Sequence, residues 1–339
     1  VCLAVSSVAS AGSEQPVTVP ESLSVVPARI DLESSRARQH LLVSGAFFDQ
    51  TQTDLTSEAL YESSDPQVAT VSKAGLVIPH GNGTTEITAK YRNLEARTRV
   101  SVSRFDEHLP IDFRTAVIGA LSRGGCNQGA CHGSPKGKNG FRLSLRGFDP
   151  DVDYRFLTRD IFSRRVNLND PESSLLLLKA SGRIAHQGGL RFHENEPAFQ
   201  TLAQWVSEGC RDSAEHRILD RLEVLPSRRI LNVAQRKQPI IVRAHYRDGG
   251  IQDVTDLAVF TSADEDSARV SRDGIVEFQQ TAEAAILVRF LDKISTVRLT
   301  FIHTDPQFAS KDIPIRNFVD QHVFTKQRQL QLRPADIAG

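Results

Sequence analysis

Three of the four cysteines lie in the middle third of the 339-residue chain, and two of them stand just before a histidine. Cys126 and Cys131 enclose four residues, and His132 follows directly. Two thiols followed by an imidazole is the order that attaches haem c, in which each thiol adds to one vinyl group of the porphyrin. The histidine is then carried under the iron as its proximal ligand. The string therefore predicts covalent haem c at Cys126 and Cys131, with His132 on the iron.

The same residues allow two other products. The usual haem c spacer has two residues between the thiols, whereas this chain has four. In an exported protein, the simpler outcome is a disulfide between Cys126 and Cys131. Zinc bound by two Cys and two His is the third possibility. The string alone leaves all three open.

A second axial ligand must come from elsewhere in the chain. The sequence contains no Met, which removes one common ligand of haem iron. His186 follows an acidic, Pro-started helical segment at 170–179 and is the first choice, with His193 second and Cys210 third. Cys210 is otherwise expected to be a free buried thiol. Ligation by two histidines fills both axial positions and favours electron transfer over oxygen chemistry.

Helical patterns on both sides of this string could position it. Apolar residues recur every four positions over 112–121, and Gly124-Gly125 follows them, which predicts a helix that ends at the motif. Near the other end of the domain, Asn195 can cap a helix that runs to Val206, with Pro197 in its first turn. An early helix that leads into the motif and a late aromatic helix that crosses it are typical of a small class I cytochrome c. Residues 107–215 are therefore predicted to be a mainly α haem domain.

An internal repeat brackets this region. Residues 23–77 and 222–276 align without a gap at an offset of 199, with 18 of 55 positions identical. Each copy consists of short β-type segments separated by turn signals such as Arg272-Asp273-Gly274. Several short strands at this spacing predict a β-sandwich. The copies therefore predict two sandwiches, at 20–104 and 217–304.

The copies resemble bacterial Ig-like domains of group 2, also called BIG2. The matching residues in the first copy are Asp54-Leu55-Thr56, Ser63-Ser64-Asp65 and the string from Val68 to Gly75. This resemblance implies that the two copies serve as spacers or adhesion modules. Neither copy contains a cysteine, so no disulfide crosses either sandwich.

The whole arrangement resembles large exported planctomycete proteins, in which Ig-like domains flank a cytochrome c-like domain and DUF1549 and DUF1553 domains follow. The resemblance assigns Cys126 and Cys131 to the thioethers, His132 to the proximal position and His186 to a histidine in a His-Gly-Gly-Gly segment. Gln187 replaces the first glycine of that segment. The amphipathic pattern within 310–339 is similar to the start of DUF1549, and the partner is expected to be a redox protein or the downstream domain of the same polypeptide.

The ends and the charge balance indicate the compartment. Residues 1–11 are small and apolar and close on Ala-Ser-Ala, as in the second half of a secretory signal, and 1–19 are assigned to this remnant and a linker. Forty-one basic residues balance 41 acidic ones, so no overall charge favours nucleic acid, and no apolar run is long enough to span a membrane. The chain is expected in the periplasm or cell envelope. No nucleophile–base pair or carboxylate dyad indicates a hydrolase.

These patterns combine into one expectation and one alternative. The fold class is a multidomain chain with two all-β Ig-like sandwiches flanking a mainly α cytochrome c-like domain. The function is that of an exported haem c protein, which transfers electrons through a bis-His haem held by Cys126, Cys131, His132 and His186. The alternative is a structural or interaction protein of the cell envelope in which Cys126 and Cys131 form a disulfide or a zinc site.

Overall fold

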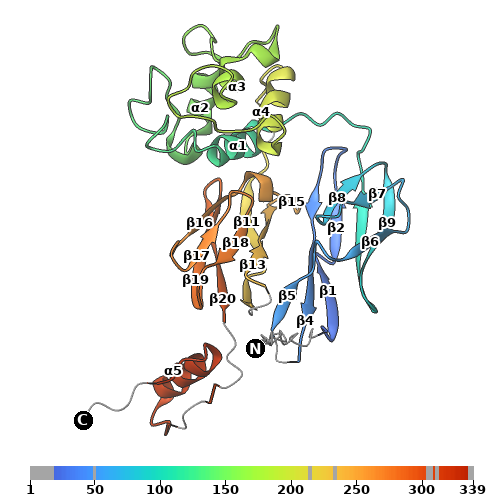
Figure 1. The fold of residues 1–339 in the computed structure, drawn as a ribbon. Coiled ribbons are helices and arrows are strands. Elements are labelled where there is room, and N and C mark those ends of the chain that lie inside the picture. Colours follow the sequence, from blue (N-terminus) through green and yellow to red (C-terminus); the bar gives the residue numbers. More distant parts are fainter. Residues whose placement is uncertain are drawn as a thin grey trace, which may run out of the picture.

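The computed structural model describes residues 19–48, 51–212, 216–231, 235–302, 308–309 and 313–334. In this part of the chain, a helical segment lies between two β units in the sequence, and a further helix lies near the C-terminus (Figure 1). The predicted export signal at 1–11 falls outside the described residues.

The two β units are built from equivalent strands, as the repeat predicts. Those of the first unit are β1 Ser22–Val26, β2 Arg29–Leu32, β3 Gln39–His40, β4 Leu42–Ala46, β5 Gln52–Asp54, β6 Leu60–Ser63, β7 Ala69–Val71, β8 Leu76–Pro79, β9 Gly83–Tyr91 and β10 Leu94–Val102. Those of the second unit are β11 Leu219–Leu225, β12 Arg228–Leu231, β13 Lys237–Pro239, β14 Ile241–Tyr246, β15 Ile251–Asp253, β16 Val259–Ser262, β17 Ala268–Val270, β18 Ile275–Phe278, β19 Ala282–Phe290 and β20 Lys293–Phe301.

Sheet connections are the same in both units. Among the described residues, each unit has a four-stranded sheet and two three-stranded sheets, and the order β2-β10-β9-β6 recurs as β12-β20-β19-β16. The first strand of each four-stranded sheet runs parallel to its neighbour, and the other pairs are antiparallel. The sequence repeat is therefore a duplication of a complete β-sandwich.

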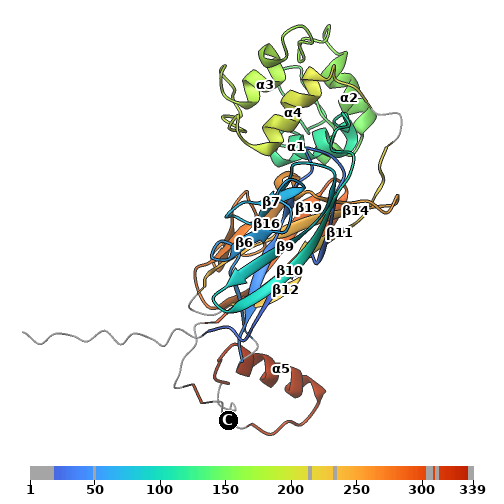
Figure 2. The ribbon, with the colours of Figure 1, turned by 90° about the vertical axis from the view of Figure 1, so that its right-hand side faces the viewer.

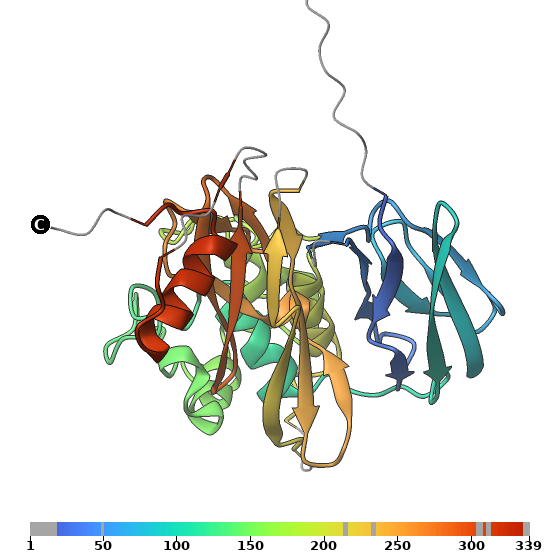
Figure 3. The ribbon, with the colours of Figure 1, turned by 90° about the horizontal axis from the view of Figure 1, so that it is seen from below.

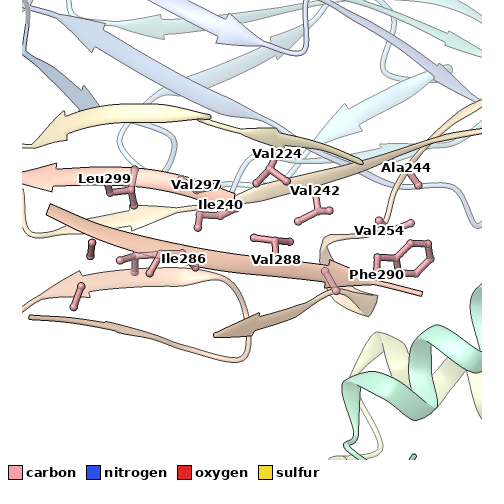
Figure 4. Close-up of a cluster of buried hydrophobic side chains, with 14 of the residues drawn as sticks. Val224, Ile240, Val242, Ala244, Val254, Ile286, Val288, Phe290, Val297 and Leu299 are labelled. Carbon is pink, nitrogen blue, oxygen red and sulfur yellow. The ribbon is translucent and has the colours of Figure 1, made fainter. Parts of the chain in front are cut away.

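Alternating side chains fill the core of each sandwich. In β19, Ile286, Val288 and Phe290 are buried, whereas Leu287 between them is 39% exposed. Successive side chains of a strand point to opposite faces, so that one face packs inward (Figure 4). Burial of each large side chain contributes roughly 1.5–3 kcal/mol.

The two sandwiches lie side by side, and polar groups connect them (Figure 1, Figure 3). Arg229 of the second unit is buried and donates to the hydroxyl of Ser44 in the first. The Nε2 of Gln235 donates to the backbone oxygen of Asp54 at 2.6 Å. The repeat therefore forms a paired platform, and the expected role of the copies as spacers or adhesion modules stays a prediction.

An ion pair lies in the same interface. The Nδ1 of His40 in the first unit is 3.0 Å from the Oδ2 of Asp253 in the second, and the Asp253 side chain is only 3% exposed. Gln39 also donates to this oxygen at 3.0 Å. Burial lowers the pKa of His40, but the hydrogen bond and charge of Asp253 outweigh it and raise that pKa to about 9. The imidazole is therefore charged at neutral pH.

The described chain is mostly β-sheet and has no large α domain, so the predicted mainly α cytochrome c-like domain is wrong. Six sheets account for most regular structure in the described chain, and the α-helices of the segment between the sandwiches have 6, 9, 6 and 11 residues. They are α1 Ile118–Arg123, preceded by a π-helical turn at Phe113–Val117, then α2 Pro150–Thr158, α3 Leu175–Ala180 and α4 Pro197–Ser207, with 3-10 turns at Leu145–Gly147 and Pro171–Ser173. Turns rich in glycine and proline occupy the long connections and prevent longer helices.

Large aromatic side chains nevertheless give this helical domain its own core. Trp205 on α4 and Phe113 are both fully buried, with ring centres 5.2 Å apart, and Tyr154 on α2 packs edge-on against Phe113. The predicted helices at both ends of the domain are present here, although the second begins after Glu196 and not after Asn195. Their contact sets the frame in which the loops between them are held.

The helical domain rests on one end of the sandwich pair (Figure 2). A Cβ on Gly119 of α1 would lie 2.9 Å from the ring of Phe290, so only glycine permits this close approach. Arg123 donates to the carbonyl oxygen of Ala258 at 3.0 Å, and Arg36 of the first unit pairs with Glu208 at 3.0 Å. Both sandwiches therefore support the helical domain.

Near the C-terminus, α5 covers Phe318–Gln329 and begins at the cap Asn317, whose side chain accepts from the backbone N–H of Asp320. Its side chains are not buried within the described structure. The predicted helix is present, whereas its assignment to DUF1549 finds no support.

Candidate functional site

The predicted cysteines and His132 lie on a loop wound tightly after α1. The backbone N–H of Cys126 donates to the Leu121 oxygen at 2.9 Å, and the N–H of His132 donates to the Cys126 oxygen at 3.0 Å. Cys131 is linked in the same way to Gln128. These turns bring the two thiols and the imidazole to one side of the loop.

Glycines make this winding possible. A Cβ on Gly133 would lie 2.1 Å from the backbone oxygen of Asn127, which no side chain tolerates. Gly125 has a φ of +71°, in the left-handed region that favours glycine. The glycines around the motif therefore serve the backbone path itself.

Two imidazoles face the same cavity. The Nδ1 of His132 is 3.0 Å from the Phe141 carbonyl oxygen, and the Nδ1 of His186 is 3.0 Å from that of Gly189. A carbonyl oxygen only accepts, so each Nδ1 must donate, which leaves Nε2 with its lone pair in the neutral ring. The ring planes are 7° apart and their centres 6.4 Å apart. One ligand can therefore contact both rings.

The cavity between these loops has a volume of about 710 Å³. Apolar side chains from α1, from the loop after the motif and from α3 form much of its wall, and cationic side chains stand among them. Its lining residues are Leu121, Cys126, Ala130, Cys131, His132, Lys138, Asn139, Phe141, Ile161, Arg164, Arg165, Leu175, Leu176, Lys179, Ala180, Ala185, His186, Gln187, Gly188 and Arg191. All four residues that the sequence predicted for the site, Cys126, Cys131, His132 and His186, thus border one cavity.

Burial keeps two of these groups uncharged. It raises the pKa of the Cys126 thiol to about 12, so this thiol is protonated at neutral pH. Burial also lowers the pKa of His132 and outweighs the hydrogen bond to Phe141, which raises it, and the positive charges of Arg165 and Arg191 act in the same direction as burial. The cavity therefore presents a neutral imidazole and a protonated thiol to a ligand.

The other candidate ligands lie elsewhere. His193 is exposed and does not border the cavity, and its backbone N–H donates to Glu196. Cys210 is a free thiol that is only 3% exposed, packed in the core of the helical domain. Its carbonyl oxygen accepts from the Tyr154 hydroxyl at 2.8 Å. The expectation of a free buried thiol at this position is met.

Sequence reasoning missed most of the cations at the cavity. Arg164, Arg165, Lys179 and Arg191 come from three separate loops and helices, so no local motif could have revealed them. The guanidinium carbon of Arg165 lies 4.4 Å from the centre of the Phe141 ring, and its Nη1 pairs with the Oδ2 of Asp160 at 3.1 Å. Such a cluster becomes visible only when the loops are folded together.

The predicted function at this site must be corrected. Within the described ranges, no group of three or more His, Cys, Asp or Glu side chains could hold a metal ion. This finding overturns the predicted electron transfer through a bis-His iron centre, and it also overturns the zinc alternative. Cys126 and Cys131 are free thiols in the structure, so the disulfide alternative is wrong as well.

The cofactor is a separate question, and haem c at Cys126 and Cys131 stays a prediction. Two parallel imidazoles beside two thiols fit a flat group that contacts both rings. Attachment would add one haem mass to the peptide that contains both cysteines. Mass spectrometry after expression with a haem c maturation system measures this mass, and an unmodified peptide would contradict the prediction.

Comparisons with known proteins give distant likenesses. No model of a known protein family and no curated protein matches the chain. Domains 5–6 of the S-layer protein SbsC share 11% identity, with 85% of this chain and 99% of that one covered and a TM-score of 0.35. Extracellular domains 3–5 of Drosophila OTK share 8% identity, with 83% and 61% covered and a TM-score of 0.18.

The first two cadherin repeats of human protocadherin-24 are similar at 8% identity, with 84% of this chain and 100% of that one covered and a TM-score of 0.19. Sequence identities and TM-scores this low do not allow the activity of any of these proteins to be assigned to this chain. In the described part of this chain, no helix has both the length and the apolar character needed to cross a bilayer.

Proposed function

We propose that the protein is an exported module of the cell envelope whose helical domain binds a small, largely apolar molecule. The observation that carries this proposal is the cavity of about 710 Å³ bordered by His132 and His186. Binding sites for small molecules usually enclose roughly 300–1,000 Å³ and combine apolar walls with a few polar groups. The cavity has this size and this composition.

The position of the polar groups supports the proposal. In the described residues, neither the Nε2 of His132 nor the Nε2 of His186 has a hydrogen-bond partner. The Nδ1 atom of each ring is held by a carbonyl oxygen. Such anchoring orients each ring before a ligand arrives, which reduces the entropy lost on binding. Apolar contact with Phe141, Leu175 and Leu176 would provide the affinity, and the rings would orient the ligand.

The sandwiches support the site mechanically. Gly119 packs against Phe290 of the second sandwich, and Glu208 of the helical domain pairs with Arg36 of the first. A platform of this kind holds the helical domain in one orientation. The chain is thus best described as a rigid carrier for a binding site.

Export and partners complete the proposal. The signal-like sequence at 1–11 supports a location in the periplasm or cell envelope. A partner protein or a downstream domain of the same polypeptide would have α5 available for contact, because Phe318 and Val319 are 73% and 50% exposed there.

Filling the mouth of the cavity tests the proposal. Ala185 borders the cavity and is exposed, so a tryptophan there occupies ligand space without disturbing the core. We expect Ala185→Trp to weaken binding of the neutral dye N-phenyl-1-naphthylamine by at least about tenfold, which corresponds to about 1.4 kcal/mol. A fluorescence titration of the dye measures this change.

Ala74→Trp serves as the matched control, because Ala74 is exposed on the first sandwich, outside the cavity lining. This control should bind the dye as the unchanged protein does. Failure of the unchanged protein to bind the dye saturably would contradict the proposed function, as would equal binding by Ala185→Trp.

A further inference from the structure

We propose that the ligand of this cavity carries acidic groups, which Lys138, Arg164, Lys179 and Arg191 bind around its apolar body. This inference rests on the proposed function and names the class of ligand. The side chains of Lys138 and Arg164 are exposed at the rim, whereas Lys179 and Arg191 are half-buried. Together they place positive charge on the wall and at the mouth.

These four cations are not balanced by acidic groups. None of the residues that border the cavity is Asp or Glu. Arg165 alone among the lining cations has a carboxylate partner in the described chain, Asp160 at 3.1 Å. Lys179 and Arg191 donate instead to the carbonyl oxygens of Ala185 and Gly188. A carbonyl contact holds a cationic side chain in place but leaves its charge uncompensated.

The second cavity differs from the first because a carboxylate lies on its wall. It has a volume of about 390 Å³ and lies between α5 and the four-stranded sheet of the second sandwich. Arg228, Arg298 and Lys326 border it together with Glu283, and the last two cations are paired with that carboxylate. The whole chain also has as many acidic as basic residues, 41 of each. The positive charge on the wall of the first cavity is thus less compensated than that of the second cavity or of the whole chain.

The surroundings of the cations make them effective. Leu175 and Leu176 on α3 and the Phe141 ring lie on the same wall, so the charges act close to apolar surface that water solvates poorly. Charge–charge attraction is stronger there than in bulk water. Burial is the main cause of the lowered pKa of His132, and the charges of Arg165 and Arg191 add to it. An apolar molecule with carboxylate or sulfonate groups satisfies both parts of the wall at once.

Two dyes that differ in one acidic group separate this inference from the proposed function. The probes are 8-anilinonaphthalene-1-sulfonate, which is an anion, and the neutral N-phenyl-1-naphthylamine. We expect the anion to bind at least about tenfold more tightly and to lose affinity as salt is added. Ala185→Trp must weaken both dyes, which locates them in the cavity.

A double variant removes the rim charges. Lys138→Gln with Arg164→Gln should weaken the anionic dye about tenfold and leave the neutral dye within about twofold. Lys73→Gln with Arg269→Gln is the matched control, since both side chains are exposed on the sandwiches. Equal affinities of the two dyes, or an anion affinity unchanged by the rim variant, would overturn the inference and leave the proposed function standing. If neither dye binds, the proposed function itself fails.

Discussion

Replacing Gly133 with alanine is expected to collapse the loop that holds Cys131 and His132. A Cβ at this position would lie 2.1 Å from the Asn127 oxygen and 2.6 Å from its carbonyl carbon. Both atoms belong to the backbone, so the clash cannot be relieved by turning a side chain. We expect the helical domain to lose about 3 kcal/mol of stability, the upper part of the range for overpacking.

Gly129→Ala in the same loop provides the control. A Cβ on Gly129 would lie 4.0 Å from the nearest heavy atom, a methyl of Leu145. Calorimetry should show a lowered unfolding temperature for Gly133→Ala alone, and dye binding should be lost in that variant alone. Equal stability of the two variants would show that the loop does not follow the path described.

The interface between the sandwiches is expected to weaken at alkaline pH because His40 loses its proton. Its pKa is raised from 6.5 to about 9 in the folded protein. A raised pKa gives stability that is fully present below pH 6.5 and is lost as the pH rises through about 9. A shift of this size corresponds to about 3 kcal/mol. Asp253 is the partner, and the carboxylate of Asp256 also acts on His40.

Guanidinium denaturation of the unchanged protein and of His40→Gln at pH 6.5 and pH 10 measures this loss. The unchanged protein should lose about 3 kcal/mol more than the variant across this interval. His80→Gln is the control, because His80 is an exposed histidine of the same sandwich. A pH dependence of His40→Gln equal to that of the unchanged protein would rule out this ion pair as the cause.

The sandwiches could be predicted because the repeat and the alternation of apolar residues act locally. A gapless repeat preserves strand lengths and turns, and the alternation seen at Ile286, Val288 and Phe290 places one face inward. The packing of the two copies could not be predicted. Asp54 and Asp253 are equivalent in the repeat, yet their partners differ. Arg229 lies near Asp54, whereas His40 pairs with Asp253.

The site was predicted in part. Cys126, Cys131 and His132 were found from their spacing, and His186 from its place in the loop after the helical segment at 170–179; all four border the cavity. The mainly α domain was wrongly predicted because the two flanking helices were interpreted as the frame of a cytochrome c, whereas turns and short helices occupy most of the chain between them. Arg164, Arg165, Lys179 and Arg191 were missed because they are separated by as many as 27 positions, from Arg164 to Arg191, and only tertiary folding brings them to one wall.

Nuclear magnetic resonance of the histidine rings tests the central claim, that His132 and His186 contact one bound molecule. With nitrogen-15 in the imidazoles, titration of the anionic dye should shift the Nε2 resonances of His132 and His186 together, at the same ligand concentration. The resonances of His40 and His80, which lie outside the cavity lining, should not move. Saturable dye binding that leaves the His132 and His186 signals in place would contradict the account.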